Sequence, residues 1–174
     1  MRHHRSLSLA ALGLLVAALC ATTAAAEDCS GFKWPVDTEV GWLKAGGDIE
    51  LKSGAEIAEA PAKAITLELE PAKSASLAAT PGVKAQAIGA DAYSGWFKIG
   101  GGLKPGLYKV SLSTNGWIDV VQGGALIPSH GFSGQRECTV IHKSVRYEIG
   151  AGPVVVQIAG APQQRVRLTV SPAN

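Results

Sequence analysis

Residues 107–121 read LYKVSLSTNGWIDVV and carry the clearest fold signal in the chain. Apolar and polar side chains alternate from residue 107 to residue 113, which is the pattern of a β-strand with one apolar and one polar face. Asn115 and Gly116 then precede a second apolar stretch. Asn-Gly between two strands is typical of a β-hairpin, because both residues tolerate positive φ angles. We therefore predict strands at Leu107–Ser113 and Trp117–Val121, joined by a tight turn.

Similar short segments, separated by Gly and Pro, predict further strands along the chain. They are Ala64–Glu70, Ser76–Ala79, Lys84–Ile88, Tyr93–Ile99, Ala125–Ile127, Ser144–Ile149, Pro153–Ile158 and Arg165–Val170. Residues 154–156 are all valine, which indicates a central strand covered on both faces. The predicted fold is all-β, a single antiparallel β-sandwich of jelly-roll type, and a closed barrel is the alternative.

One short helix is expected at the start of this domain. It covers Thr38–Lys44, with Asp37 as its N-cap and Gly46-Gly47 as its end, and it would turn Val40 and Leu43 inward. Residues 128–137 are polar and contain Gly, so they are predicted to form a loop.

The N-terminus has the three parts of a secretory signal peptide. A basic start at residues 2–5 precedes an apolar run at residues 7–19, and Ala24 and Ala26 give the small-residue end. Cleavage after Ala26 would leave one domain at residues 27–174. A retained membrane anchor over residues 7–26 is disfavoured, because Ala and Thr make its second half weakly apolar and its first half alone is short for a bilayer. A lipoprotein is disfavoured by Leu19 before Cys20.

Charge and cysteine usage agree with a periplasmic or secreted protein. Without Arg2 and Arg5 the chain has 14 Lys and Arg against 14 Asp and Glu, so no basic surface predicts nucleic acid as a partner. After cleavage we expect no membrane span. Cys29 and Cys138 remain, and two thiols in an oxidising compartment are expected to pair. Two unpaired thiols are the alternative.

Patterns for catalysis are weak. Ser133 lies in Gly-Phe-Ser-Gly-Gln, which lacks the final Gly of a nucleophile elbow.

His130 and His142, with Glu137, are the candidates for a two-His, one-carboxylate iron site. The His-x-His pair of cupin-type sites is absent. We therefore expect no metal and no other cofactor, with the iron site as the alternative.

Two groups of residues are candidates for ligand binding. The first is a polar stretch near Cys138 whose cations could hold a carboxylate or a phosphate. It consists of His130, Arg136, His142, Lys143 and Arg146. The second is an aromatic pair, Trp34 and Trp42, which is expected to be more exposed than Trp96 and Trp117 and could stack on a sugar ring. Ordinary strand-surface residues and core tryptophans are the alternative for both groups.

Three stretches resemble a group of small exported proteobacterial proteins of unknown function. They are residues 28–35 (DCSGFKWP), 116–121 (GWIDVV) and 143–147 (KSVRY). Some members of the group are labelled homogentisate dioxygenase. A genuine homogentisate dioxygenase is a much larger cytosolic enzyme with a His/Glu iron site, so the label does not follow from this short, His-poor chain. Residues 105–112 (PGLYKVSL) are also similar to β-sandwich domains appended to secreted peptidases.

These observations predict an exported, non-catalytic protein that binds a small ligand, a glycan or an envelope partner. An iron-dependent dioxygenase-like enzyme and a purely structural envelope protein are the two alternatives.

Overall fold

The computed structural model describes residues 28–83 and 88–173. The predicted signal peptide at residues 1–26 lies outside the described residues, and so does most of the predicted strand Lys84–Ile88. Within the described part, no helix combines the length and the apolar character that a bilayer crossing needs.

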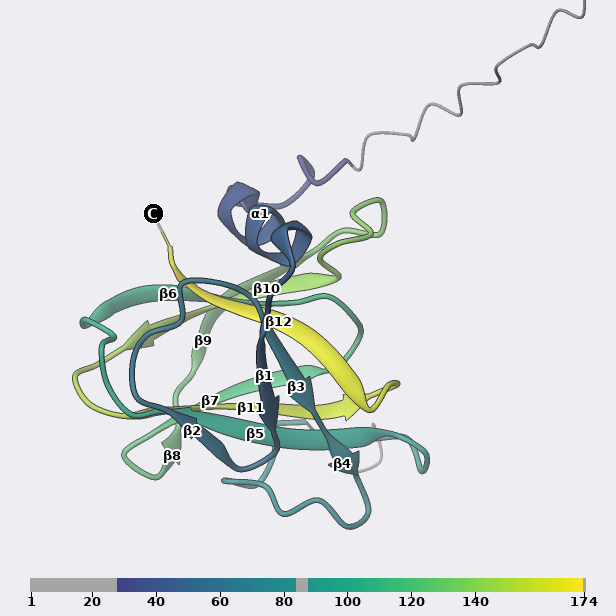
Figure 1. Ribbon diagram of the computed structural model, residues 1–174, viewed down its shortest axis with the longest axis vertical. Coiled ribbons are helices and arrows are strands. Elements are labelled where there is room, and N and C mark those ends of the chain that lie inside the picture. Colours follow the sequence, from purple (N-terminus) through teal and green to yellow (C-terminus); the bar gives the residue numbers. More distant parts are fainter. Residues whose placement is uncertain (1–27, 84–87, 174) are drawn as a thin grey trace, which may run out of the picture.

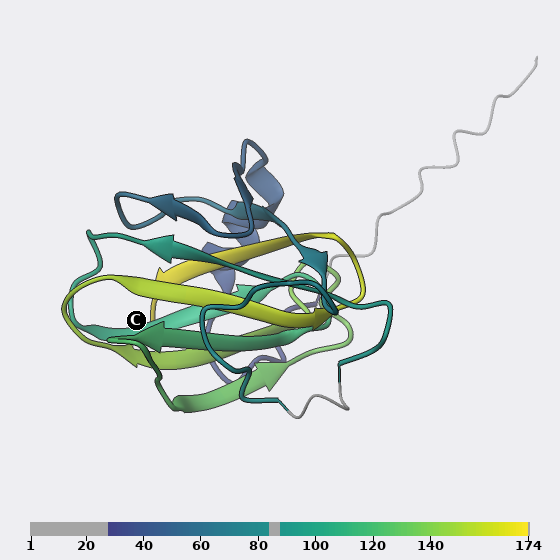
Figure 2. The same cartoon turned by 90° about the horizontal axis from the view of Figure 1, so that it is seen from below.

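The described chain is mostly β-structure, in two sheets that lie one above the other (Figures 1 and 2). Sheet A has the order β1 (Ile49–Lys52), β3 (Ile65–Glu68), β12 (Arg165–Pro172), β6 (Gly106–Leu112), β10 (Lys143–Ile149) and β9 (Ser129–Gly134). Sheet B has the order β2 (Ala55–Ile57), β5 (Tyr93–Ile99), β11 (Val154–Ala161), β7 (Trp117–Gln122) and β8 (Ala125–Leu126), and β4 (Glu70–Pro71) also pairs with β5.

Strand pairing is mixed, so the prediction of a purely antiparallel arrangement is wrong. β1 runs parallel to β3, and β2 runs parallel to β5. The cause is the path of the chain, which leaves sheet A after β1, forms β2 in sheet B, and returns to sheet A as β3. All other pairs in the described residues are antiparallel. The sheets are open, so the chain is not a closed barrel.

The predicted hairpin at Asn115-Gly116 is also absent. β6 lies in sheet A and β7 lies in sheet B, and the turn carries the chain from one sheet to the other. β6 already pairs with β12 on one side and β10 on the other, so it has no free edge for β7. Gly116 is needed for close packing, because a Cβ there would lie 3.1 Å from the Leu112 side chain and 3.4 Å from Ile158.

Most predicted strands are confirmed with small shifts at their ends, and the exceptions are informative. Residues 128–137 were expected as a loop, but Ser129–Gly134 forms β9 on the edge of sheet A. Residues 76–79 were expected as a strand and form none. The valine run at residues 154–156 lies in β11, which is central in sheet B as predicted.

The helix α1 spans Asp37–Ala45 and lies on the outer face of sheet A (Figure 1). Asp37 is its first residue rather than its cap, because the N-cap position belongs to Val36, and Gly46 ends the helix with a φ of 71°. Leu43 is buried as predicted, and so is Glu39, whereas Val40 is only half-buried.

Two hydrophobic clusters stabilise this arrangement. The larger one lies between the sheets and contains the inward-facing apolar residues of both. The smaller one lies under residues 28–45, which we call the N-terminal arm, and includes Trp34, Leu43 and Ile141. Cys29 and Cys138 form the predicted disulfide, with their Cα atoms 4.7 Å apart. The bond fastens the N-terminal arm to the segment between β9 and β10.

Candidate functional site

Three large apolar side chains are exposed among the described residues, and all three lie on one side of the molecule. Trp117, Leu126 and Phe132 are 41%, 37% and 66% exposed. They belong to β7, β8 and β9, which lie at or next to the edges of sheet B and sheet A. Tyr147 of β10 donates a hydrogen bond to the Ile118 carbonyl of β7 at 2.6 Å, so the two sheets face each other here.

Two adjoining hollows open at this edge. One, of about 170 Å³, is lined by Trp117, Ile118, Ser129, Phe132, Lys143, Val145 and Tyr147. The other, of about 270 Å³, is lined by Gly82, Trp117, Ile118, Asp119, Leu126, Ile127, Pro128, Ser129 and Tyr147. Because Trp117, Ser129 and Tyr147 line both, we treat the two hollows as one site and call it the edge cleft.

The local strand structure explains why the core is open at this edge. β8 has only two residues, so it covers little of the sheet B edge. β9 carries an irregularity in its pairing with β10 opposite Arg146 and Tyr147, which disturbs the edge of sheet A. A bulge of this kind bends a strand and redirects its side chains. Phe132, which pairs with Val145 in the ladder, is left two-thirds exposed at the mouth.

The Trp117 ring is held in place by a buried carboxylate. Its Nε1 donates to Asp119 Oδ1 at 2.8 Å, and Asp119 Oδ2 accepts the backbone N–H of Gly82 at 3.0 Å. Asp119 is 8% exposed. Because both carboxylate oxygens are engaged, the indole is oriented before any ligand arrives, which lowers the entropic cost of stacking on it.

Tyr147 forms a fixed wall of the edge cleft. Its hydroxyl is committed to the Ile118 carbonyl, and burial raises the pKa of Tyr147, with the nearby charge of Asp119 acting in the same direction. The phenol therefore stays neutral over the physiological pH range.

Lys143 is the cation of the edge cleft. It is half-buried, and its Nζ donates to the Gly116 carbonyl at 2.5 Å. Burial lowers the pKa of Lys143. No ion pair joins Lys143 to a carboxylate within the part of the chain that the structure describes.

The tryptophans lie differently from the expectation. Trp34 is buried at 8% exposure, and its Nε1 donates to Ser144 Oγ at 3.0 Å. Trp42 and Trp96 are half-buried, and Trp117 is the most exposed of the four. The expectation that Trp34 is exposed is wrong, because the N-terminal arm folds back over sheet A and buries the ring.

The predicted cationic stretch is divided between two places. Lys143 lines the edge cleft, whereas Arg146 stacks over the Trp34 ring at 4.2 Å, on the opposite face of sheet A beneath the N-terminal arm. His130, Arg136 and His142 are exposed. The structure therefore brings only one of these five residues into the edge cleft.

The residues of the alternative iron site are not brought together. His130 lies beside the irregularity at Arg146 and Tyr147, whereas His142 precedes β10 next to Gly134. This spacing of about four residues separates them by roughly 13 Å along the ladder. Among residues 28–83 and 88–173, no three His, Cys, Asp or Glu side chains, Glu137 included, form a group that could hold a metal ion.

A second polar cluster lies on the outer face of sheet A, buried beneath the N-terminal arm. Glu39 of α1 pairs with Lys109 of β6 at 2.9 Å and also accepts a hydrogen bond from Ser171. Ser111 and Ser144 bond to each other at 2.9 Å. The sequence pattern marks this as a solvent face, but the arm covers it. Glu39 and Lys109 hold the arm there, while the buried Glu39 Oε2 and Arg146 Nε atoms have no hydrogen-bond partner among the described residues.

A third hollow, of about 700 Å³, is lined by residues of the N-terminal arm, from Asp28 to Gly41. No residue of the two sheets is among the described residues that line it. The edge cleft, in contrast, is closed by four strands from two sheets.

Comparison of the chain with protein-family models, with curated proteins and with solved structures finds no match. The function is therefore inferred from the chemistry of the edge cleft itself.

Proposed function

We propose that this chain is an exported, non-catalytic binding protein whose edge cleft takes the flat ring of a small ligand or a glycan unit. One observation carries the proposal. The three exposed large apolar side chains, Trp117, Leu126 and Phe132, all line the two adjoining hollows. Large exposed apolar patches on soluble domains are commonly binding sites, and apolar hollows with a few polar groups are the usual form of a ligand site.

The chemistry of the walls suits a ring with one apolar face. Trp117 and Phe132 offer aromatic surface, and stacking on such rings contributes beyond the area that is buried. Ser129, Asp119 and Lys143 lie at the margin and supply the polar contacts that orient a ligand. In this proposal the two sheets act as a β-sandwich scaffold that is open at one edge.

Export is part of the proposal. It is supported by the signal-peptide pattern of residues 1–26 and by the Cys29–Cys138 disulfide, which is typical of oxidising compartments. The resemblance to small exported proteobacterial proteins agrees with it. Periplasmic and secreted locations are equally compatible with both features.

Tryptophan fluorescence tests the binding proposal directly. Trp117 is the most exposed tryptophan, so a ring stacked on it should change the emission of the purified domain. We expect a hit from a panel of oligosaccharides and small aromatic acids, and we expect Trp117→Ala and Phe132→Ala to weaken that binding at least tenfold. Trp42→Ala, in the arm, is the matched control and should bind normally.

Failure of this test has a defined meaning. If no panel member changes the fluorescence, or if Trp117→Ala binds as well as the parent protein, the edge cleft is not a ring-binding site. A purely structural role in the envelope would then become the better proposal.

A further inference from the structure

Two lysine side chains lie against the aromatic walls of the edge cleft. Lys143 lines the smaller hollow together with Trp117 and Phe132. Lys33, from the N-terminal arm, places its Nζ 5.5 Å from the centre of the Phe132 ring. Lys33 is held there by its own backbone, whose N–H donates to Ser133 Oγ at 3.0 Å. Lys143 is thus the lysine that lines the site, and Lys33 contributes a cation–π contact to the Phe132 ring in its wall.

The charge of Lys143 lacks a negative partner among the described residues. Its one acceptor there is the neutral Gly116 carbonyl, although an ammonium group has three donors. Desolvating a cation is unfavourable unless an opposite charge compensates it. An anion bound in the smaller hollow would supply that compensation and would also meet an unused donor.

Among the described residues, one carboxylate lines the edge cleft, and it lies at the other hollow. Asp119 lies behind Trp117, 8% exposed, with both oxygens already bonded to Trp117 Nε1 and the Gly82 N–H. The edge cleft thus has a cation, Lys143, in its smaller hollow and a carboxylate, Asp119, in its larger hollow. A negative substituent on a bound ring would therefore lie on the side of Lys143, away from Asp119.

We infer that the edge cleft selects a ring that bears a carboxylate, with the ring on Trp117 and Phe132 and the carboxylate beside Lys143. The inference rests on the proposed function and adds the charge of the ligand to it. A uronic-acid unit of a glycan and a free aromatic acid share this chemistry. The charge-assisted hydrogen bond to Lys143 would be the contact that distinguishes the acid from a neutral ring of the same shape.

The experiment compares each acid with its neutral counterpart on the same purified domain. The probes are oligogalacturonate against its methyl ester, and benzoate against benzamide. We expect at least one acid to bind about tenfold or more tightly than its neutral form. Raising the salt from about 0.01 M to about 1 M should remove most of that preference, because the Debye length falls from about 30 Å to about 3 Å.

Charge-removal variants locate the effect. Lys143→Met keeps the apolar stem and should remove the difference in affinity between the acid and its neutral counterpart. Lys52→Met, on the exposed β1 edge at the far side of sheet A, is the matched control. Lys143→Gln, which retains a donor for the Gly116 carbonyl, is the second variant should Lys143→Met fail to fold. Either oligogalacturonate or benzoate as the better acid supports the inference and identifies the source of the carboxylate.

Three outcomes would overturn the inference. Acid and neutral probes that bind equally, with loss in Trp117→Ala, would refute the charge preference but leave the ring-binding function in place. An acid preference that survives both Lys143→Met and Lys143→Gln would show that the carboxylate is not bound by Lys143, which refutes the inferred position of the carboxylate. No binding of any probe would refute the ring-binding function and the inference together.

Discussion

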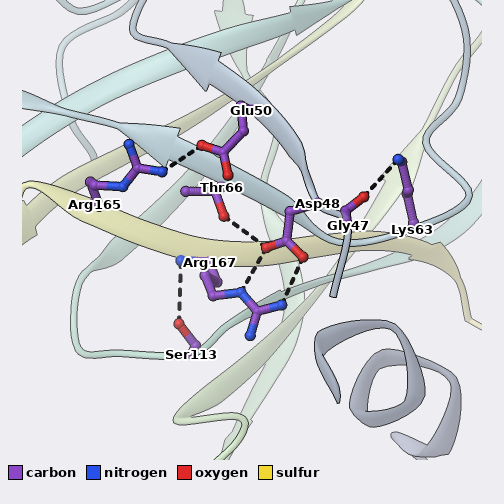
Figure 3. A network of polar contacts seen from close by, with 8 residues as sticks. All are labelled: Gly47, Asp48, Glu50, Lys63, Thr66, Ser113, Arg165 and Arg167. Atoms are coloured by element: carbon purple, nitrogen blue, oxygen red, sulfur yellow. Dashed lines mark hydrogen bonds and ion pairs between the residues drawn. The ribbon is translucent and has the colours of Figure 1, made fainter. Parts of the chain in front are cut away.

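Asp48 joins three parts of sheet A through its side chain (Figure 3). Its carboxylate accepts two hydrogen bonds from the Arg167 guanidinium of β12, at 2.6 and 2.7 Å, and one from the Thr66 hydroxyl of β3 at 2.7 Å. Asp48 is almost completely buried, whereas the nearby Glu50–Arg165 pair is more than half exposed. The two ion pairs therefore differ in their contact with water, and they should differ in their contribution to the free energy of unfolding.

Replacing Asp48 with Asn should lower the free energy of unfolding at pH 7 by about 1–3 kcal/mol, the usual range for lost hydrogen bonds to charged groups. The Arg167 hydrogen bonds hold the pKa of Asp48 below its ordinary value, against the opposing effect of burial. A group with a lowered folded-state pKa contributes stability above its unfolded pKa of about 3.9, and this is lost as the pH falls through the folded value.

The difference between Asp48→Asn and the parent protein should therefore shrink between about pH 4 and about pH 2, as measured by urea denaturation. Glu50→Gln is the control, because exposed pairs contribute about 0–1 kcal/mol. Equal losses in the two variants at pH 7, or a loss from Asp48→Asn that does not change with pH, would contradict this account.

Single residues also show what local sequence cannot predict. Trp117 follows Asn115-Gly116 and precedes apolar residues, which favours a core position, yet it begins β7 at the open edge of two sheets. The sequence predicts an exposed Trp34, yet the ring is buried and donates a hydrogen bond to Ser144, 110 positions away. The exposure of both tryptophans depends on contacts between segments that are distant in the sequence. A periodic pattern along one strand cannot predict such contacts.

At the scale of elements, the buried pair of Glu39 and Lys109 fixes α1 on sheet A. Lys109 Nζ also donates to the Pro35 carbonyl at 2.9 Å, so one cation holds both the helix and the segment before it. The two side chains are 0% and 7% exposed. Removing one partner from such a pair leaves an uncompensated buried charge.

We expect Glu39→Leu or Lys109→Met alone to destabilise the domain by about 3–5 kcal/mol, because the remaining charge stays buried. The double variant should recover most of this loss, because two apolar side chains can replace a buried ion pair. Urea denaturation of the four proteins measures the coupling. Losses that simply add in the double variant would show that the two side chains do not act as a pair.

The disulfide attaches the N-terminal arm covalently to the segment between β9 and β10. Replacing Cys29 and Cys138 together with Ser should cost about 2–5 kcal/mol, because the bond closes a long loop in the unfolded chain. The free arm should also expose Trp34, which shifts its fluorescence to longer wavelength. A double variant as stable as the parent protein, with unchanged fluorescence, would show that packing alone holds the arm.

Elements with strict alternation were predictable, and irregular ones were not. β10 and β12 follow the period-two pattern and were predicted within two residues at either end. β9 has the sequence SHGFSG, which lacks such a pattern and contains two Gly, so only its pairing with β10 reveals it as a strand. The edge cleft was missed for the same reason, since β9 and Phe132 form one of its walls.

At the scale of the whole molecule, the arm and the edge cleft lie on different surfaces of sheet A. The helix of the arm lies on the outer face (Figures 1 and 2). The cleft lies between the sheets and is lined by residues of β7, β8, β9 and β10. The alternating pattern gives the apolar side of each strand but cannot say which strands share a sheet. Lys33 is the described side chain that links the arm to the cleft, through its contact with Phe132.

The proposed export makes a prediction about the whole natural product. The Cys29–Cys138 disulfide is compatible with an oxidising space, where the proposal of export places the protein. We expect the protein isolated from its own cells to begin at Glu27 and to be lighter than the reduced chain by the two hydrogen atoms that the disulfide releases. Intact-mass spectrometry with and without a reductant measures both properties. A product that keeps residues 1–26, or whose mass does not change on reduction, would place the protein in another compartment.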